Sequence, residues 1–157
     1  MLKRLLKVKE RRVEVAAKKS ATARLDLEHR EDSLKKKEHD LDETLERNKS
    51  KVRELFGEVK GQAIGLRDLE LMKAKFAEMR ELERHKRLAI HDAKSDVEKA
   101  EEELAEAKLK LHKAHRNSEK TLELINLQTE EDRRAKEVKN EKELEDFVSI
   151  RRKHESS

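Results

Sequence analysis

The chain contains no proline, cysteine, tryptophan or tyrosine, and it has only three glycines and three phenylalanines in 157 residues. Without cysteine there is no disulfide framework and no thiolate chemistry. Without proline, the strongest helix breaker is missing from every position. No apolar run reaches the roughly 18 residues that a membrane span needs, and no apolar segment follows the charged N-terminus as it would in a secretory signal. We therefore expect a cytoplasmic protein that does not insert into a membrane.

Charged residues are abundant, at 48% of the chain, whereas hydrophobic residues make up 34% and aromatic residues 2%. This composition is typical of a coiled coil or a long helix, and it supplies a narrow apolar seam rather than a wide interior. The 40 basic and 36 acidic residues are interspersed and leave a net charge of only +4. Such a pattern does not create the basic field that nucleic-acid binding requires. We expect no enzyme, no cofactor and no nucleic-acid partner.

The three glycines, Gly57, Gly61 and Gly65, lie four residues apart near the middle of the chain. Each costs roughly 1 kcal/mol relative to alanine inside a helix, so helix is weakest here. We interpret the triplet as the bend of a helical hairpin, with Gly61 or Gly65 as the left-handed residue that ends the first arm. The alternative is one continuous helix with small residues on one face. The hairpin divides the chain into arm one (1–60), a bend (61–66), arm two (67–127) and an overhanging charged tail (128–157).

Both arms carry apolar residues at alternating spacings of three and four, which is the heptad pattern of a coiled coil. The seam of the first arm includes Arg24, Leu27, Glu31, Leu34, Glu38, Leu41, Leu45, Asn48, Val52, Leu55 and Val59. One heptad position of the second arm reads Leu69, Phe76, Glu83, Ile90, Val97, Leu104 and Leu111. Its partner position reads Met72, Met79, Lys86, Ala93, Ala100, Ala107 and Ala114, and the alanines allow two backbones to approach closely. The heptad frame shifts across the glycines, which supports a bend, although a stutter in a continuous coil would also shift it.

A bend near residue 63 predicts which residues face each other. Lys86 should lie opposite Asp40, and Leu2 should lie opposite Leu124. Independently, the apolar seam of the second arm fades after Ala114, where the first arm runs out of chain. The predicted fold is therefore all-α, a long antiparallel two-helix coiled-coil hairpin. The tail beyond it should be a frayed single helix that becomes ordered on a partner.

Few residues suggest chemistry. His112, His115 and Glu119 have a spacing that could hold a metal on one helix face, but such groups are common in highly charged helices, and we expect no metal site. The acidic run from Glu101 to Glu103 has no cleft to shift its pKa values, and there is no glycine-rich phosphate loop. Binding by helix surfaces remains as the function that the sequence indicates.

Two regions have apolar residues beyond the needs of a two-helix seam. One follows the bend and contains Met72, Phe76 and Met79, and it is either a partner surface or a wider local core. The other is the pair of free ends, residues 1–13 and 144–152, which we expect the hairpin to bring near each other. The basic N-terminus is open to three interpretations: a helix on an anionic membrane surface, a mitochondrial presequence, or the first turns of the coiled-coil arm, which we favour.

The two ends of the chain resemble the FliJ/YscO family, the stalk proteins of flagellar and injectisome type III secretion. The first resemblance is the opening Leu-Leu-Lys-Val-Lys-Glu-x-x-Val-Glu-x-Ala-Ala of residues 5–17. The second is Glu-Lys-Glu-Leu-Glu-Asp-Phe at 141–147, followed by Arg151 and Arg152. The stretch of Leu69, Met72, Lys73 and Phe76 after the bend fits more loosely. The lack of aromatic residues near the bend departs from some flagellar members and leaves the choice between the flagellar and the injectisome branch open. We favour the injectisome branch, with its link to virulence.

The resemblance implies a non-enzymatic stalk at the base of the secretion apparatus. Its paired ends would insert into a hexameric export ATPase, and the region near the bend would contact the export-gate membrane protein. Some members also escort secretion chaperones. By position, the implied ATPase contacts are Leu5, Leu6, Lys9, Val13, Phe147, Ile150 and Arg151, and the implied gate contacts are Met72, Phe76 and Met79. The alternative is a generic coiled-coil scaffold or dimerisation module without an ATPase partner.

Overall fold

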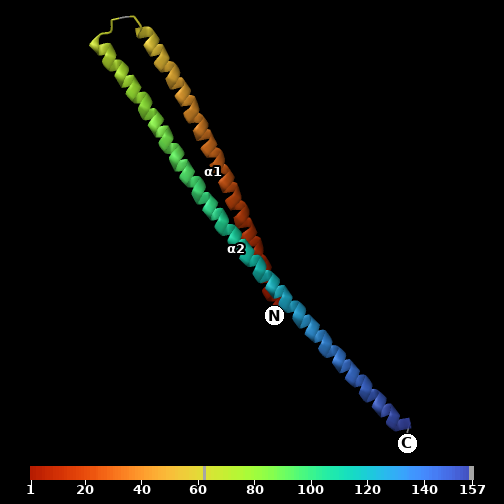
Figure 1. Cartoon of the computed structure of the whole chain (residues 1–157). Helices are drawn as coiled ribbons and strands as arrows, with labels where there is room; N and C mark the ends of the chain where they lie inside the picture. Colours follow the sequence, from red (N-terminus) through yellow and green to blue (C-terminus); the bar gives the residue numbers. More distant parts are fainter. Residues whose placement is uncertain (62, 156–157) are drawn as a thin grey trace. The chain divides into compact units, whose positions relative to one another are not determined.

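The structure, a computed structural model, describes residues 1–61 and 63–155 and contains two α-helices. Helix α1 spans Leu2–Val59 and helix α2 spans Leu66–Glu155 (Figure 1). No strand is present among these residues. The fold is an all-α helical hairpin, as the heptad pattern predicted.

Gly61 is the one described residue with a left-handed backbone, at a φ of 83°. Helix α1 ends at Val59, two residues before this glycine, and the Lys60 amide still donates a hydrogen bond to the Phe56 carbonyl at 3.0 Å. The Leu69 amide donates to the Gly65 carbonyl at 3.1 Å and starts α2. Gly57 lies inside α1. Gln62, which belongs to the predicted bend, lies outside the described residues.

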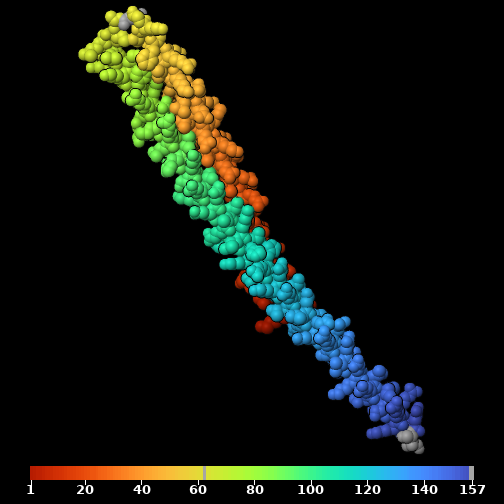
Figure 2. Space-filling model, viewed as in Figure 1, coloured from red at the N-terminus to blue at the C-terminus, as the bar shows by residue number. Residues whose placement is uncertain are grey.

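The chain divides into two units, and each is described by itself. One unit is Lys19–Ala107, and the other combines Met1–Lys18 with the described residues of 108–157. In the unit of residues 19–107, Arg30 pairs with Asp96 at 3.7 Å, and Lys86 pairs with Asp40 at 3.1 Å. Residue numbers rise along α2 as they fall along α1, so the arms are antiparallel. The predicted pairing of Lys86 with Asp40 is confirmed. Figure 2 shows the side chains of the two arms in direct contact on the viewed face.

The core of this unit is narrow, because two helices can bury only one stripe each. Ala93 and Ala100 are 4% and 1% exposed, and Met72 and Leu104 are also buried. The α1 side of the seam is more polar, since its buried residues include Ser20, Thr44 and Asn48. Small alanines on α2 thus let the backbones approach closely.

Four predicted seam positions are wrong. Arg24, Glu31 and Glu38 are exposed, whereas Ala23 and Arg30, the residues directly before the first two, are half-buried. Arg30 occupies the seam because its long apolar stem can lie along the interface while its guanidinium reaches Asp26 and Asp96. Leu69 is 41% exposed, because it lies in the first turn of α2 and the seam starts one turn later.

In the unit that contains both chain ends, the half-buried residues of 1–18 are Leu2, Leu6, Lys9, Val13 and Ala16. Those of α2 in the same unit run from Leu111 to Ile125, with Thr121 buried at 4% exposure and Glu130 half-buried further on. Every described side chain from 131 to 155 is exposed, although the helix continues to Glu155. The charged tail is therefore a single solvent-exposed helix, drawn in blue in Figure 1.

Candidate functional surfaces

The tail of α2 carries a stripe of large apolar side chains that are open to solvent. Leu144, Phe147 and Val148 are 64%, 61% and 42% exposed. At about 100° per residue they fall within a sector of about 100° on the helix, and Arg151 falls in the same sector. Ile150, at 61% exposure, lies beside it. We call Leu144, Phe147 and Val148 the tail stripe.

The N-terminal residues implied as ATPase contacts lie in a different environment. Leu6, Lys9 and Val13 are half-buried in the seam of their unit, and only Leu5 is exposed, at 42%. These side chains mainly hold the N-terminal segment against α2. Leu5 is the member of this group that can reach a partner.

The expectation that residues 1–13 and 144–152 lie near each other is wrong. Within their unit, the half-buried α2 residues that face the N-terminal segment end near Ile125. Phe147 follows 22 residues later, which is about 33 Å along a helix. The physical reason is length, since α2 has 90 residues and α1 has 58. The N-terminal and C-terminal candidates therefore form two separate surfaces.

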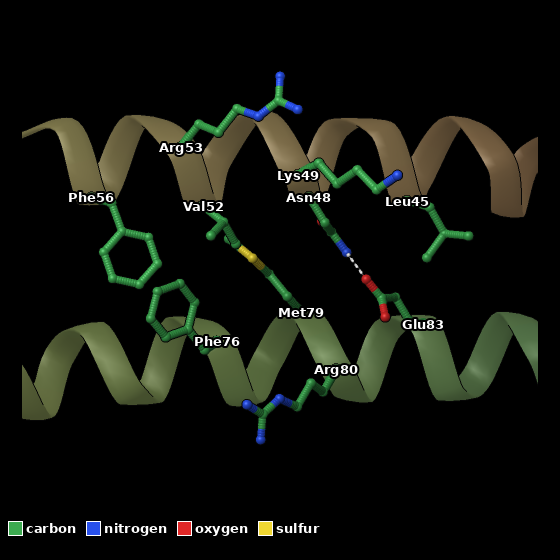
Figure 3. A pocket seen from close by; sticks show the side chains of 10 residues that line it. All are labelled: Leu45, Asn48, Lys49, Val52, Arg53, Phe56, Phe76, Met79, Arg80 and Glu83. Carbon is green, nitrogen blue, oxygen red and sulfur yellow. Dashed lines mark hydrogen bonds between the residues drawn. The ribbon is translucent and has the colours of Figure 1, made fainter.

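A groove of about 630 Å³ lies between α1 and α2 in the unit of residues 19–107 (Figure 3). Its apolar lining comes from both helices: Leu45, Val52, Phe56, Phe76 and Met79. The rings of Phe56 and Phe76 stack with centroids 5.9 Å apart and planes 28° apart. Phe56 is nonetheless 57% exposed, so the groove opens to solvent on an aromatic pair. We call this feature the aromatic groove.

Basic side chains border the aromatic groove. Figure 3 places Arg53 on the outer side of α1 and Arg80 on the outer side of α2, with the apolar residues between them. Lys49 also lines the groove and lies 3.9 Å from Glu46 on its own helix. Neither arginine has a carboxylate oxygen within 4.0 Å in the described part of the chain. An apolar floor between two unpaired cations favours an acidic, amphipathic ligand.

Of the three implied gate contacts, Phe76 and Met79 are half-buried and line the aromatic groove. Met72 is 8% exposed and belongs to the core, so it does not offer a contact surface. Phe56 lines the groove but was not singled out from the sequence. A bend near residue 63 pairs Phe56 with a residue near 70 rather than with Phe76, so the pairing expected from the sequence carried no signal for this contact.

Polar side chains interrupt the seam next to the aromatic groove. The Asn48 amide donates a hydrogen bond of 3.0 Å to Glu83, and Asn48 is 5% exposed. One helical turn away, the Lys86 ammonium donates to the hydroxyl of Thr44, which is 2% exposed. The buried side-chain nitrogen and oxygen atoms of the described residues all have partners. This polar layer specifies one register because any slip would leave those groups unpaired.

The ionisable side chains of the described residues lie mostly on the exposed surfaces of the helices. No group of three or more His, Cys, Asp or Glu side chains among them is placed to hold a metal ion, and the group of His112, His115 and Glu119 is no exception. A hydrogen bond from Arg84 lowers the pKa of Glu81 and raises that of Arg84, but both side chains are exposed on one helix. This is an ordinary surface ion pair. None of the described helices is long and apolar enough to cross a membrane.

The chain belongs to the class of α-helical hairpin proteins, because its described residues form two antiparallel helices. Its surface carries an apolar groove between the helices and an exposed apolar stripe on the tail. Within that class, residues 2–150 match the family described as "Type III secretion protein YscO". The match covers almost the whole chain, so the chain belongs to the YscO family of type III secretion proteins. No curated protein and no solved structure matches the chain.

Proposed function

We propose that the chain is a non-enzymatic stalk of a type III secretion export apparatus. In this role it binds a hexameric export ATPase and links it to the export gate, at the cytoplasmic base of the apparatus. The observation that carries the proposal is the tail stripe, because large apolar side chains that cluster on an exposed helix face mark a protein-binding surface. Membership of the YscO family supplies the secretion system.

Because residues 1–13 and 144–152 lie apart, the proposed ATPase contact lies mainly on the tail of α2. Phe147, Ile150 and Arg151 are all exposed and form the main contact. Leu5 contributes from the N-terminal segment, whereas Leu6, Lys9 and Val13 act indirectly by packing that segment against α2. The contact is thus a single α2 helix end rather than a pair of helix ends.

The gate contact is proposed at the aromatic groove. Phe76 and Met79 line the groove, and Phe56 is the most exposed aromatic ring in it. Aromatic and methionine side chains are enriched at protein interfaces because they supply large contact areas that adapt to a partner. Escort of secretion chaperones is a further role that the resemblance implies, and the same apolar groove is the surface available for it.

The test is binding of the full chain to the cognate export ATPase. Replacing Phe147 and Ile150 with Asp puts charge on the proposed contact and should weaken binding by about tenfold or more. Val138→Asp is the matched control, since Val138 is 62% exposed in the same helix but lies outside the tail stripe. The control should bind like the wild type.

A doubly truncated variant can refute the proposal. Removal of residues 1–13 and 140–157 should abolish ATPase binding while α-helical circular dichroism per residue is retained. ATPase binding that survives both truncations would refute the stalk proposal and leave a generic coiled-coil scaffold as the better description.

A further inference from the structure

The aromatic groove has the features of a surface that lacks its partner. Its floor includes Phe56, which is 57% exposed, and its two sides carry Arg53 and Arg80, which have no carboxylate within 4.0 Å in the described residues. Exposed aromatic area is unfavourable in water, and unpaired arginines beside it attract acidic side chains. The groove therefore fits a helix with one apolar stripe and acidic residues on both of its flanks.

The opposite face of the same hairpin differs in charge. A second groove there is lined by Lys51 and Lys75 but also by Glu54, Glu58 and Glu78, so it has no cationic excess. The two grooves therefore differ in charge balance, and basic side chains outnumber acidic ones only in the lining of the groove that contains Phe56 and Phe76.

The chain itself contains a segment with the complementary pattern. Residues 141–148 read Glu-Lys-Glu-Leu-Glu-Asp-Phe-Val and are all exposed. At about 100° per residue, Glu141 and Glu145 fall on one flank of the tail stripe and Glu143 falls on the other. An apolar stripe with carboxylates on both sides matches an apolar groove with arginines on both sides.

We propose that the aromatic groove of one copy binds the tail segment 141–148 of a second copy. Phe147 and Leu144 would cover the Phe56–Phe76 pair, and the flanking glutamates would face Arg53 and Arg80. The tail and the α2 wall of the groove belong to one uninterrupted helix, so a copy could dock its own tail only by breaking that helix. The occupant is for this reason a second molecule.

The size of the contact sets its strength. One helical segment of eight residues buries less surface than a standard protein interface, so the association should be reversible and lie in the micromolar to millimolar range of dissociation constants. Because exposed charges contribute, raising the ionic strength should weaken it. Association of this kind covers both surfaces that the proposed function uses, and so keeps them masked until the ATPase and the gate compete for them.

Sedimentation equilibrium of the purified full chain, without any other protein, is the primary test. The wild type should show a concentration-dependent increase in mass. Reversing the groove charges (Arg53→Glu with Arg80→Glu) or the tail charges (Glu143→Arg with Glu145→Arg) should weaken association by about tenfold or more in each variant alone. An equimolar mixture of the two variants should associate again, because the unaltered tail of one variant meets the unaltered groove of the other.

A matched control uses the other face, where Glu54→Arg with Glu58→Arg should leave self-association as in the wild type. All variants must keep the helical circular dichroism signal of the wild type. A wild-type chain that stays monomeric at millimolar concentration, or variants that self-associate undiminished, would overturn the proposal. Because no ATPase is present, these outcomes are independent of the proposed stalk function.

The absence of cysteine allows the contact to be mapped directly. Lys49→Cys places a thiol in the lining of the groove, and Val148→Cys places one in the tail stripe. When the two single variants are mixed under mild oxidation, the mixed disulfide that joins one variant to the other should form in preference to either symmetric one. Preferential cross-linking between two Val148→Cys copies would instead indicate tail-to-tail pairing and refute docking into the groove.

Discussion

Asn48 and Glu83 allow the energetics of the polar layer to be tested quantitatively. Asn48 is 5% exposed, and its amide donates to the Glu83 carboxylate at 3.0 Å across the seam. Removing the acceptor by Glu83→Ala leaves a buried amide without its partner, which should lower the free energy of unfolding by about 1–3 kcal/mol. Glu101→Ala, at an exposed position of the same helix, is the control and should change it by no more than about 0.5 kcal/mol.

Urea denaturation followed at the helical circular dichroism band gives the required free energies. A cycle of Asn48→Ala, Glu83→Ala and the double variant should yield a coupling energy of about 1–2 kcal/mol. Replacing both residues with leucine removes the polar pair altogether and should stabilise the hairpin by about 1 kcal/mol or more, since an apolar pair of similar shape needs no hydrogen bond. A coupling energy below about 0.3 kcal/mol would show that Asn48 and Glu83 do not stabilise each other. A leucine pair that destabilises the hairpin would show that the polar pair does not cost stability relative to an apolar one.

Two further predictions concern the bend and the surface charges. Gly61→Ala should destabilise the hairpin by about 1–2 kcal/mol, because the residue has a φ of 83°. Gly57 lies inside α1, and an added carbon there meets no neighbouring side chain within 4 Å, so Gly57→Ala should stabilise the hairpin by about 0.5–1 kcal/mol. The midpoints of urea denaturation compare the two variants with the wild type. The carboxyl of Glu81, hydrogen-bonded by Arg84, should titrate by carbon-13 NMR below the usual range, and Arg84→Gln should raise its pKa. Because the folded pKa is lowered, any stabilisation by this pair is present above the unfolded pKa and is lost as the pH falls through the folded pKa. A Glu81 titration midpoint unchanged by Arg84→Gln would contradict that cause.

Much of the fold could be predicted because heptad spacing and helix breakers are local signals. Ala93 and Ala100, two of the predicted alanine positions of arm two, are the most buried apolar residues of the described chain. The facing of Lys86 and Asp40 followed from the position of the bend alone. The seam errors have separate causes. Arg30 lies in the seam by its long apolar stem, which a count of apolar residues does not register, and Leu69 lies one turn before the seam of α2 starts.

The candidate surfaces were less predictable, because they depend on what the two helices leave uncovered. Met72 and Phe76 share the same apolar pattern in the sequence, yet Met72 is in the core and Phe76 lines an open groove. Phe56 joins that groove from the other helix, and only the three-dimensional pairing makes it visible. Helix α2 has 90 residues and α1 has 58, so Phe147 lies well past the part of α2 that packs against the N-terminal segment.

The alignment of α1 against α2, which the buried polar layer fixes, also determines the shape of the aromatic groove on the surface. The stacking of Phe56 on Phe76, with centroids 5.9 Å apart, requires one alignment of α1 against α2. A slip by one heptad would move one helix by about 10 Å along the other and separate the rings. The apolar seam opposes such a slip only weakly, because alanine and leucine repeat at equivalent positions. The Asn48–Glu83 pair opposes it strongly, because a slip would leave two polar groups unpaired. A polar layer that costs stability thus maintains the groove on which the proposed contacts depend.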